Sequence, residues 1–239
     1  MPPNPEPASA AALGPADLAR MELFRALEVE QQQRLLENHR PLSLAADQTV
    51  VLEQDESQGI FLLRSGLVKV RCFDLQGEET VLAVLGPGEV CGEMAVLHPQ
   101  GLRTADVVTL TPCSLVILRA GPFAGLLHSE PRLSLALAQL QAKRLQTLNR
   151  RLRLRAGDAN LRLLATLVEL ATRSAVNAAA TDPIPPLPQR ELACLAGLAR
   201  ETASRTLANL RRRGLVADTP EGGLRLLNAE DLRRRGLLG

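Results

Sequence analysis

Apolar and polar residues alternate along the middle of the chain in the manner of β-strands. Val68, Val70 and Cys72, for example, alternate with Lys69 and Arg71, and such alternation predicts a half-buried strand. The strand-like segments are short and are separated by Gly-containing turns; they comprise residues 60–73 (broken at Ser65-Gly66), 78–85 and 106–118. Many short strands with Gly turns predict an antiparallel barrel or jelly roll that starts near residue 41.

Helix-like spacing precedes and follows this region. Residues 17–38 are expected to form one or two short helices, because Leu23, Phe24 and Leu27 share a face. A long helix follows the strands, with Ser129 as its expected cap, and the next helix, 159–173, has Asp158 as its cap. A last helix at 229–237 is expected to be capped by Asn228. The long helix carries a leucine stripe made of Leu133, Leu137, Leu140, Leu145 and Leu148 and ends near residue 152 or 154.

The leucine stripe leaves two interpretations open. A long helix with an apolar seam usually pairs with another helix, and a second copy of the same chain is the natural partner. The alternative is that the stripe packs against the chain's own barrel. Both can hold at different turns of the helix.

Residues 187–216 form the pattern of two short helices around a tight turn at Gly197. The exposed side of the second helix begins with Arg200, Glu201, Ser204 and Arg205 and ends with three arginines. A helix in the DNA major groove reads bases with its N-terminal side chains, where Arg can donate twice to guanine and Glu can accept from cytosine. Charged i,i+4 pairs alone would also fit a solvated surface helix, but the wing-like hairpin at 217–227 favours a winged helix-turn-helix.

Residues 88–108 interrupt the rhythm of the strands. A short helical segment is expected from Gly92-Glu93 to Leu97, followed by a loop to Arg103 and Thr104. A Glu can accept hydrogen bonds from sugar hydroxyls, and an Arg beside a Thr hydroxyl can bind an anion. Glu93 and Arg103 therefore suggest the two ends of a ribose-phosphate pocket, with a surface salt bridge as the alternative.

Charge is distributed unevenly along the chain. Of the 28 Lys/Arg and 26 Asp/Glu residues, 18 and 9 lie from residue 140 onward, which leaves 10 and 17 before it. A basic C-terminal part on an acidic N-terminal part fits a DNA-binding domain attached to a domain of another kind. Trp and Tyr are absent, which argues against base stacking on single-stranded nucleic acid.

The remaining composition excludes several classes. No apolar run approaches the roughly 20 residues of a membrane span, and no signal peptide is recognisable, so we expect a cytoplasmic protein without membrane contact. The four cysteines, Cys72, Cys91, Cys113 and Cys194, are scattered; this predicts no metal site, no iron–sulfur cluster and no disulfide framework. No nucleophile–base constellation indicates an enzyme.

Three segments of the chain resemble those of the Crp/Fnr family of bacterial transcription regulators, between about residues 20 and 230. They are GxxxGExAxL…RTA at 88–105, AKRLQ at 142–146 and RETASRTLANL at 200–210. The resemblance implies an α+β fold with an N-terminal cyclic-nucleotide-binding-type β-roll (a jelly roll), a long dimerisation helix and a C-terminal winged helix-turn-helix. We place a disordered tail at 1–16, the roll at 17–128, the dimerisation helix at 129–157 and the DNA-binding domain at 158–239.

Within the family the chain looks closest to the cAMP-binding branch, which implies a ligand site. Gly92, Glu93, Arg103 and Thr104 match residues that hold ribose and cyclic phosphate, and Arg144 matches an Arg of the long helix. The two hydroxyl residues that receive adenine in that branch are matched by Leu148 and Asn149. Leu148 cannot hydrogen-bond a purine, so only Asn149 is carried over. The cofactor implied is cAMP. Haem is not expected, because Cys91 has no His in register.

The same resemblance implies a DNA-binding set. It consists of Gln189, Arg200, Glu201, Ser204 and Arg205. The Ser that precedes the reading helix in that branch is replaced by Ala199, which removes a cap and a phosphate contact. The expected operator is a palindrome resembling TGTGA-N6-TCACA in double-stranded DNA.

Three functional hypotheses result. The first is a homodimeric transcription regulator, expected to be an activator that contacts RNA polymerase and is gated by a cyclic nucleotide. The second is the same fold acting without a ligand and controlled by expression level or redox. The third, disfavoured by the reading helix, is a cyclic-nucleotide-binding regulatory subunit.

Overall fold

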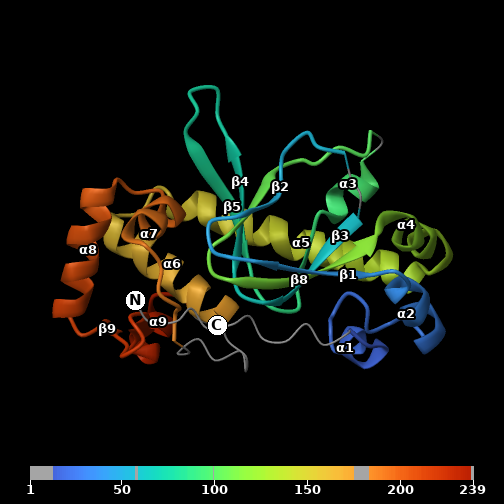
Figure 1. The fold of residues 1–239 in the computed structure, drawn as a ribbon. Helices are drawn as coiled ribbons and strands as arrows, with labels where there is room; N and C mark the ends of the chain where they lie inside the picture. Colours follow the sequence, from blue (N-terminus) through green and yellow to red (C-terminus); the bar gives the residue numbers. More distant parts are fainter. Residues whose placement is uncertain (1–12, 57–58, 99, 175–182, 238–239) are drawn as a thin grey trace. The chain divides into compact units, whose positions relative to one another are not determined.

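The computed structural model describes residues 13–56, 59–98, 100–174 and 183–237 (Figure 1). The described residues form two compact units, one within 1–70 and 85–146, the other within 71–84 and 147–239. Residues 1–12 of the expected tail lie outside the described residues. Leu13 is buried, and the first helix begins at Pro15.

Two four-stranded sheets form the predicted roll. One has the order β1-β8-β3-β6 and the other β2-β7-β4-β5 (Figure 1). β8 pairs antiparallel with both β1 and β3, and β7 pairs antiparallel with β2. The strands are β1 Arg40–Leu44, β2 Thr49–Val51, β3 Gly59–Ser65, β4 Val68–Phe73, β5 Glu79–Leu85, β6 Val90–Cys91, β7 Asp106–Thr109 and β8 Cys113–Arg119. The strand segments expected from alternation are therefore confirmed.

The turn at Ser65-Gly66 shows why glycine is needed there. Gly66 has φ +88°, and a Cβ on it would lie 2.4 Å from the carbonyl oxygen of Pro112. The backbone conformation and the lack of space both exclude a larger residue. The chain can thus pass directly from β3 into β4.

Short helices flank the roll and contribute to one apolar core. Near the N-terminus the helices are α1 Pro15–Ala19 and α2 Val29–Leu36. Leu23, Phe24 and Leu27, whose spacing predicted a helix, lie instead in the turns and bends between them and are buried in the core. α4 Ala120–Ser129 adds Phe123, whose ring meets Phe24 edge-on with centroids 6.3 Å apart. α4 was not expected. Because Ser129 is the last residue of α4 and the long helix starts at Pro131, the prediction that Ser129 caps the long helix is wrong.

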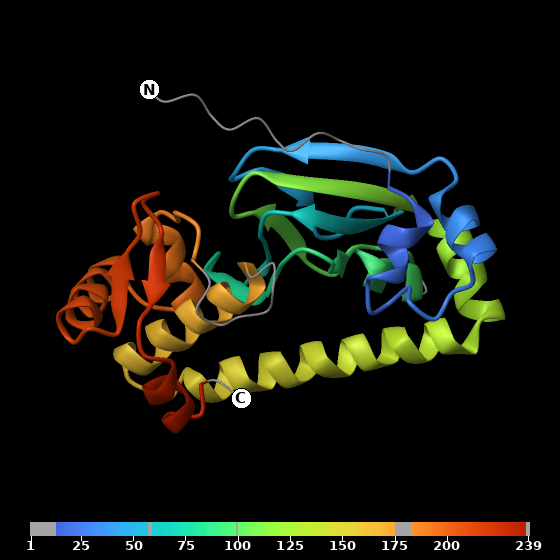
Figure 2. The ribbon, with the colours of Figure 1, turned by 90° about the horizontal axis from the view of Figure 1, so that it is seen from below.

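The long helix α5, Pro131–Leu154, presents different faces to the protein and to solvent. Figure 2 shows it as one uninterrupted helix. Leu133 and Leu137 are buried in the apolar core of the roll. Leu135, Leu145 and Leu152 are 60%, 58% and 53% exposed. The leucines therefore do not form one stripe: the first members pack on the chain's own roll, and a separate apolar face remains exposed.

The second unit contains the expected winged helix-turn-helix. α6, α7 and α8 contact one another, and β9 and β10 form an antiparallel hairpin. The elements are α6 Ala159–Ser174, α7 Gln189–Ala196, α8 Arg200–Arg212, β9 Val216–Asp218, β10 Leu224–Leu226 and α9 Ala229–Arg234. Two expected caps are confirmed: Asp158 accepts from the Leu161 amide at 2.8 Å, and Asn228 accepts from the Asp231 amide at 2.9 Å.

Candidate functional site

Glu93 is the centre of a buried polar cluster in the roll. It is the first residue of the short helix α3, Glu93–Leu97, and its side chain is 1% exposed. Two residues of α5 donate to the same carboxylate oxygen, Oε1: Arg144 Nη1 at 2.5 Å and Gln141 Nε2 at 2.7 Å. The other oxygen, Oε2, is buried and has no hydrogen-bond partner among the described residues. The carboxylate is thus half satisfied, with an acceptor still available.

Arg103 is buried beside this cluster and bonded to backbone. Its Nη1 donates to the carbonyl of Gly92 and its Nη2 to that of Gly59, both at 2.8 Å. The guanidinium lies 5.5 Å from the centre of the Phe61 ring. Burial lowers the pKa of Arg103, while nearby Cys91 and Glu93 act in the opposite direction. The side chain remains a cation, because an arginine is not deprotonated in proteins.

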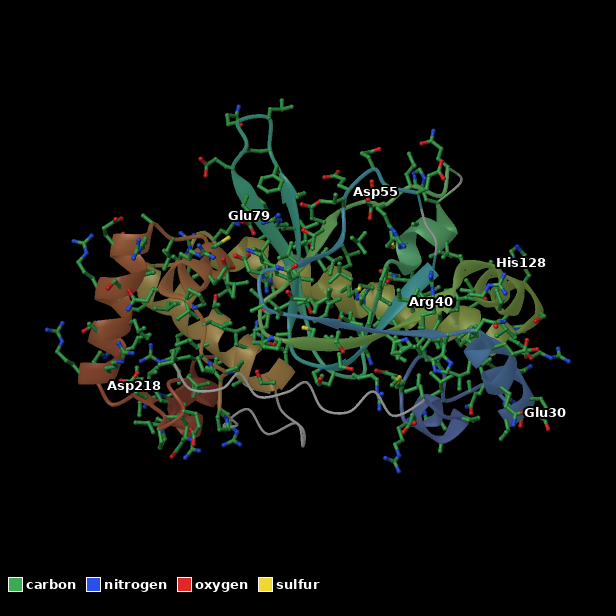
Figure 3. The ribbon with its side chains drawn as sticks, in the orientation of Figure 1. Glu30, Arg40, Asp55, Glu79, His128 and Asp218 are labelled. Atoms are coloured by element: carbon green, nitrogen blue, oxygen red, sulfur yellow. The ribbon has the colours of Figure 1, made fainter. Side chains whose placement is uncertain are left out.

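Gly92 lets Arg103 approach the turn before α3. It has φ +82°, and a Cβ there would lie 2.2 Å from Arg103 Nη1. Asp55, labelled in Figure 3, lies on the neighbouring loop, where its carbonyl accepts from the Arg103 amide at 2.9 Å. Arg103 is therefore held at its side chain by the Gly92 carbonyl and at its backbone by Asp55.

The buried cysteines of the roll are poor candidates for redox control. Burial, and then the charge of Glu93, raises the pKa of Cys91 to about 12. Burial likewise raises the pKa of Cys113 to about 11. A thiolate is the reactive species, so both side chains remain unreactive thiols near neutral pH.

The structure brings four of the expected ligand residues together, while the other two are exposed. Gly92, Glu93, Arg103 and Arg144 lie in one cluster. Thr104 is exposed. Asn149 is also exposed, and it follows Arg144 by five residues, which turns it about 140° around the helix. Gln141 was not expected in the site, although its i,i+3 spacing from Arg144 places both on one face.

The second helix of the helix-turn-helix, α8, is amphipathic. Its inner face consists of the buried residues Ala203, Thr206, Leu207 and Leu210. Arg200, Glu201 and Arg205 are exposed, Ser204 is half-buried, and Gln189 is exposed at the start of α7. The predicted DNA-contact set therefore lies on accessible surface, apart from the half-buried Ser204.

Hydrogen bonds from α6 hold this motif. Arg162 Nε donates to the Ala196 carbonyl at 3.1 Å and a terminal nitrogen of Arg162 donates to the Gly197 carbonyl. Gly197 has φ +60° in the turn. Asn209 of α8 donates to Asn160 at 3.0 Å. Ala199 precedes α8 without a side-chain cap, as the sequence indicates.

The wing is fixed to the end of α8. Arg211 donates to Asp218 at 2.5 Å, and Asp218, at the end of β9, is labelled in Figure 3.

In the same unit a cavity of about 550 Å³ is lined by arginines of α5 and α6. Arg151 pairs with Glu169 at 2.7 Å, and Arg150 donates to two C-terminal carbonyls. These two arginines therefore connect α5 to α6 and to the C-terminal residues within this unit.

Comparison with known proteins gives matches to both units. Residues 41–130 match the model of the cyclic nucleotide-binding domain, and 161–235 match the Crp-like helix-turn-helix domain. The cyclic AMP receptor protein of Thermus thermophilus is 31% identical over 195 residues, which cover 81% of this chain and 87% of that protein. The chain belongs to the Crp/Fnr family.

A further relative and a solved structure are consistent with membership of the Crp/Fnr family. A CRP-like cAMP-activated global transcriptional regulator of Mycobacterium tuberculosis is 28% identical over 83% of this chain and 89% of its own length. The solved structure of FixK2 from Bradyrhizobium japonicum has a TM-score of 0.69 at 19% identity, over 84% of this chain and 98% of FixK2, which shows the shared fold. The family consists of DNA-binding transcription regulators rather than enzymes.

Two further observations concern metal ions and membranes. Within the described ranges, no group of three or more His, Cys, Asp or Glu side chains could hold a metal ion. None of the helices in those ranges has the length and apolar character needed to cross a membrane.

Proposed function

We propose that this Crp/Fnr regulator is a homodimer gated by a cyclic nucleotide, with cAMP as the first candidate. The observation that carries the proposal is the buried and unpartnered Oε2 of Glu93, beside the cations Arg103 and Arg144. A free acceptor and two guanidinium groups match a ligand that carries both a hydroxyl and a phosphate.

In this proposal Glu93 accepts from the ribose hydroxyl, and Gly92 leaves room for Arg103 beside it. Arg103 and Thr104 neutralise and hydrogen-bond the cyclic phosphate, while Arg144 adds a second charge. Arg103 must then exchange a carbonyl contact for the phosphate. A phosphate is the stronger acceptor because the bond is charge-assisted.

The base end of the ligand is expected to be recognised less well. Leu148 offers no hydrogen bond, and Asn149 is exposed on a different side of α5 from Arg144. A second copy of the chain is one way to bring Asn149 to a base. We therefore expect weaker selection between adenine and guanine than between nucleotides with and without a cyclic phosphate.

The DNA-binding part of the proposal assigns base reading to Arg200, Glu201 and Arg205. The target is a palindrome resembling TGTGA-N6-TCACA, with Ser204 and Gln189 near the phosphates. Two-fold symmetric operators fit a two-fold dimer. We further propose that the regulator is an activator that contacts RNA polymerase and acts in the cytoplasm.

The test compares operator affinity with and without saturating cAMP in the wild type and in Arg103→Leu. The proposal expects a gain of affinity in the wild type and none in the variant. A gain that survives Arg103→Leu would refute the phosphate role of Arg103.

One observation favours a second candidate, a regulator that acts without a ligand. Side chains of the protein itself, Arg144 and Gln141, bond Glu93 to α5. An effector acts only through different affinities for two states, so a helix already held in place leaves less to change. Equal operator affinity with and without cAMP, together with no cAMP binding by calorimetry, would establish this candidate.

A further inference from the structure

We propose that Gln141 is a positioning residue that keeps the Glu93–Arg144 ion pair open for a ligand hydroxyl. The inference rests on the proposed cyclic-nucleotide site and goes beyond it, because it explains how a buried carboxylate beside a guanidinium retains a free acceptor.

An arginine and a carboxylate prefer to pair through two parallel hydrogen bonds. Arg144 and Glu93 do not. Arg144 Nη1 contacts Oε1 at 2.5 Å, while Arg144 Nε and Glu93 Oε2 are both buried and have no hydrogen-bond partner in the described parts of the chain. Leaving two such atoms unsatisfied is costly. The pair of Arg151 and Glu169 leaves the same two kinds of atom unpartnered among the described residues, but at Glu93 a second side chain, Gln141, also donates to the bonded oxygen.

Two contacts prevent the second bond. Gln141 Nε2 donates to Glu93 Oε1 at 2.7 Å and fixes the rotation of the carboxylate. The carbonyl of Val90 accepts from Arg144 Nη2 and fixes the guanidinium. Gln141 is neutral, so its effect on Glu93 is directional and leaves the charge of the pair unchanged. Without it, the carboxylate can rotate and Oε2 can meet Arg144.

The open pair offers an acceptor, Oε2, to a ligand donor. A 3′,5′-cyclic nucleotide has one free ribose hydroxyl, at the 2′ position. Gln141 therefore preserves recognition of that hydroxyl. Because Gln141 belongs to the long helix α5, its bond to Glu93 also connects the ligand site to that helix. A variant in which the pair has closed should still bind the phosphate, but it should no longer distinguish a ribose from a 2′-deoxyribose.

The test measures binding of cAMP and of 2′-deoxy-cAMP by calorimetry to the full chain. The variant is Gln141→Met, which keeps the side-chain length and removes the donor. The matched control is Gln139→Met, at an exposed position of the same helix. A hydrogen bond to a charged group predicts that the wild type and Gln139→Met prefer cAMP by about tenfold or more. Gln141→Met is expected to reduce that preference to about twofold or less.

Each alternative outcome has a distinct meaning. A wild-type preference that persists in Gln141→Met refutes the positioning role, even if both affinities fall together. Equal binding of the two nucleotides by the wild type refutes the inference and leaves the cyclic-nucleotide site standing. Failure of the wild type to bind either nucleotide refutes both the inference and the proposed function.

Discussion

Single residues of the roll cluster show what sequence spacing can and cannot reveal. Glu93 and Arg103 were expected at one site from their chemistry, and the structure places them in one cluster. Gln141 lies 48 positions from Glu93, and no local pattern connects them. Arg103 was expected to be open to an anion, whereas in this structure it bonds to two carbonyls that only the fold brings together.

Replacing Gly92 should damage the site through the backbone. In Gly92→Ala the new Cβ would need φ +82° and would lie 2.2 Å from Arg103 Nη1. We expect a loss of unfolding free energy of about 2 kcal/mol or more, since the cost of a left-handed conformation adds to a buried clash. Gly77→Ala is the matched control, because Gly77 has φ +81° with nothing within 4 Å of the Cβ. Equal losses in chemical denaturation would show that the contact with Arg103 does not matter.

Arg205 provides the sharpest test of base reading. The binding free energies for the TGTGA-N6-TCACA site and for a scrambled site differ in the wild type. Arg205→Ala should reduce this difference by about 1–3 kcal/mol, because a bidentate contact to guanine is lost. Arg212→Ala, near the end of α8, serves as the comparison: Arg212 lies outside the proposed reading set, so losing its charge should weaken binding to both DNA sequences alike. Fluorescence anisotropy at fixed salt gives the difference for both variants. A wild-type difference in Arg205→Ala would remove that residue from the reading set.

At the scale of elements, periodicity predicted most strands and helices, and its failures have local causes. α4 was missed because Gly121, Pro122 and Gly125 lower the helix propensity of its sequence, AGPFAGLLHS. Pro122 is tolerated in the first turn, where its missing N–H has little effect. Packing of Phe123 and Leu126 into the core then stabilises a helix that its composition does not favour.

The exposed face of α5 has the heptad spacing of a two-stranded seam. It is formed by Leu135, Ala138, Ala142, Leu145, Asn149 and Leu152, all of which are exposed. Alternating steps of three and four residues are typical of coiled-coil contact positions. The leucine stripe read from the sequence followed a different set of positions, several of which the roll itself buries.

This seam leads to a prediction about assembly. Leu145→Lys should convert the proposed dimer to a monomer at micromolar concentration, because it places a charge in the apolar interface. Gln146→Lys changes the next residue of the same helix, which lies outside the seam, and should leave the dimer intact. Sedimentation velocity distinguishes the two. A dimer that survives Leu145→Lys would place the interface elsewhere.

At the scale of the whole molecule, the uneven charge separates two tasks. The part from residue 140 onward has a net charge of +9, from 18 basic and 9 acidic residues, and the part before it −7, from 10 and 17. Attraction to the DNA backbone therefore belongs to the C-terminal part and falls as salt rises. Salt screens the ion pair of Glu93 and Arg144 much less than it screens exposed charges, because the pair is largely buried. Raising the salt concentration should therefore lower the affinity for DNA more than the affinity for the ligand.

The final prediction concerns the coupling of ligand and operator. If cAMP raises operator affinity by a certain factor, the operator must raise cAMP affinity by the same factor, since the coupling free energy is shared. We expect a factor of about 5–150, the usual range for such coupling. Calorimetric titration of cAMP into the free protein and into its operator complex, at one salt concentration, gives one side of this cycle, and operator titrations with and without cAMP give the other. The two factors should agree for the wild type and both fall to one in Arg103→Leu. Factors of one in the wild type, with cAMP still bound, would mean that the roll holds a ligand that does not gate the DNA-binding unit.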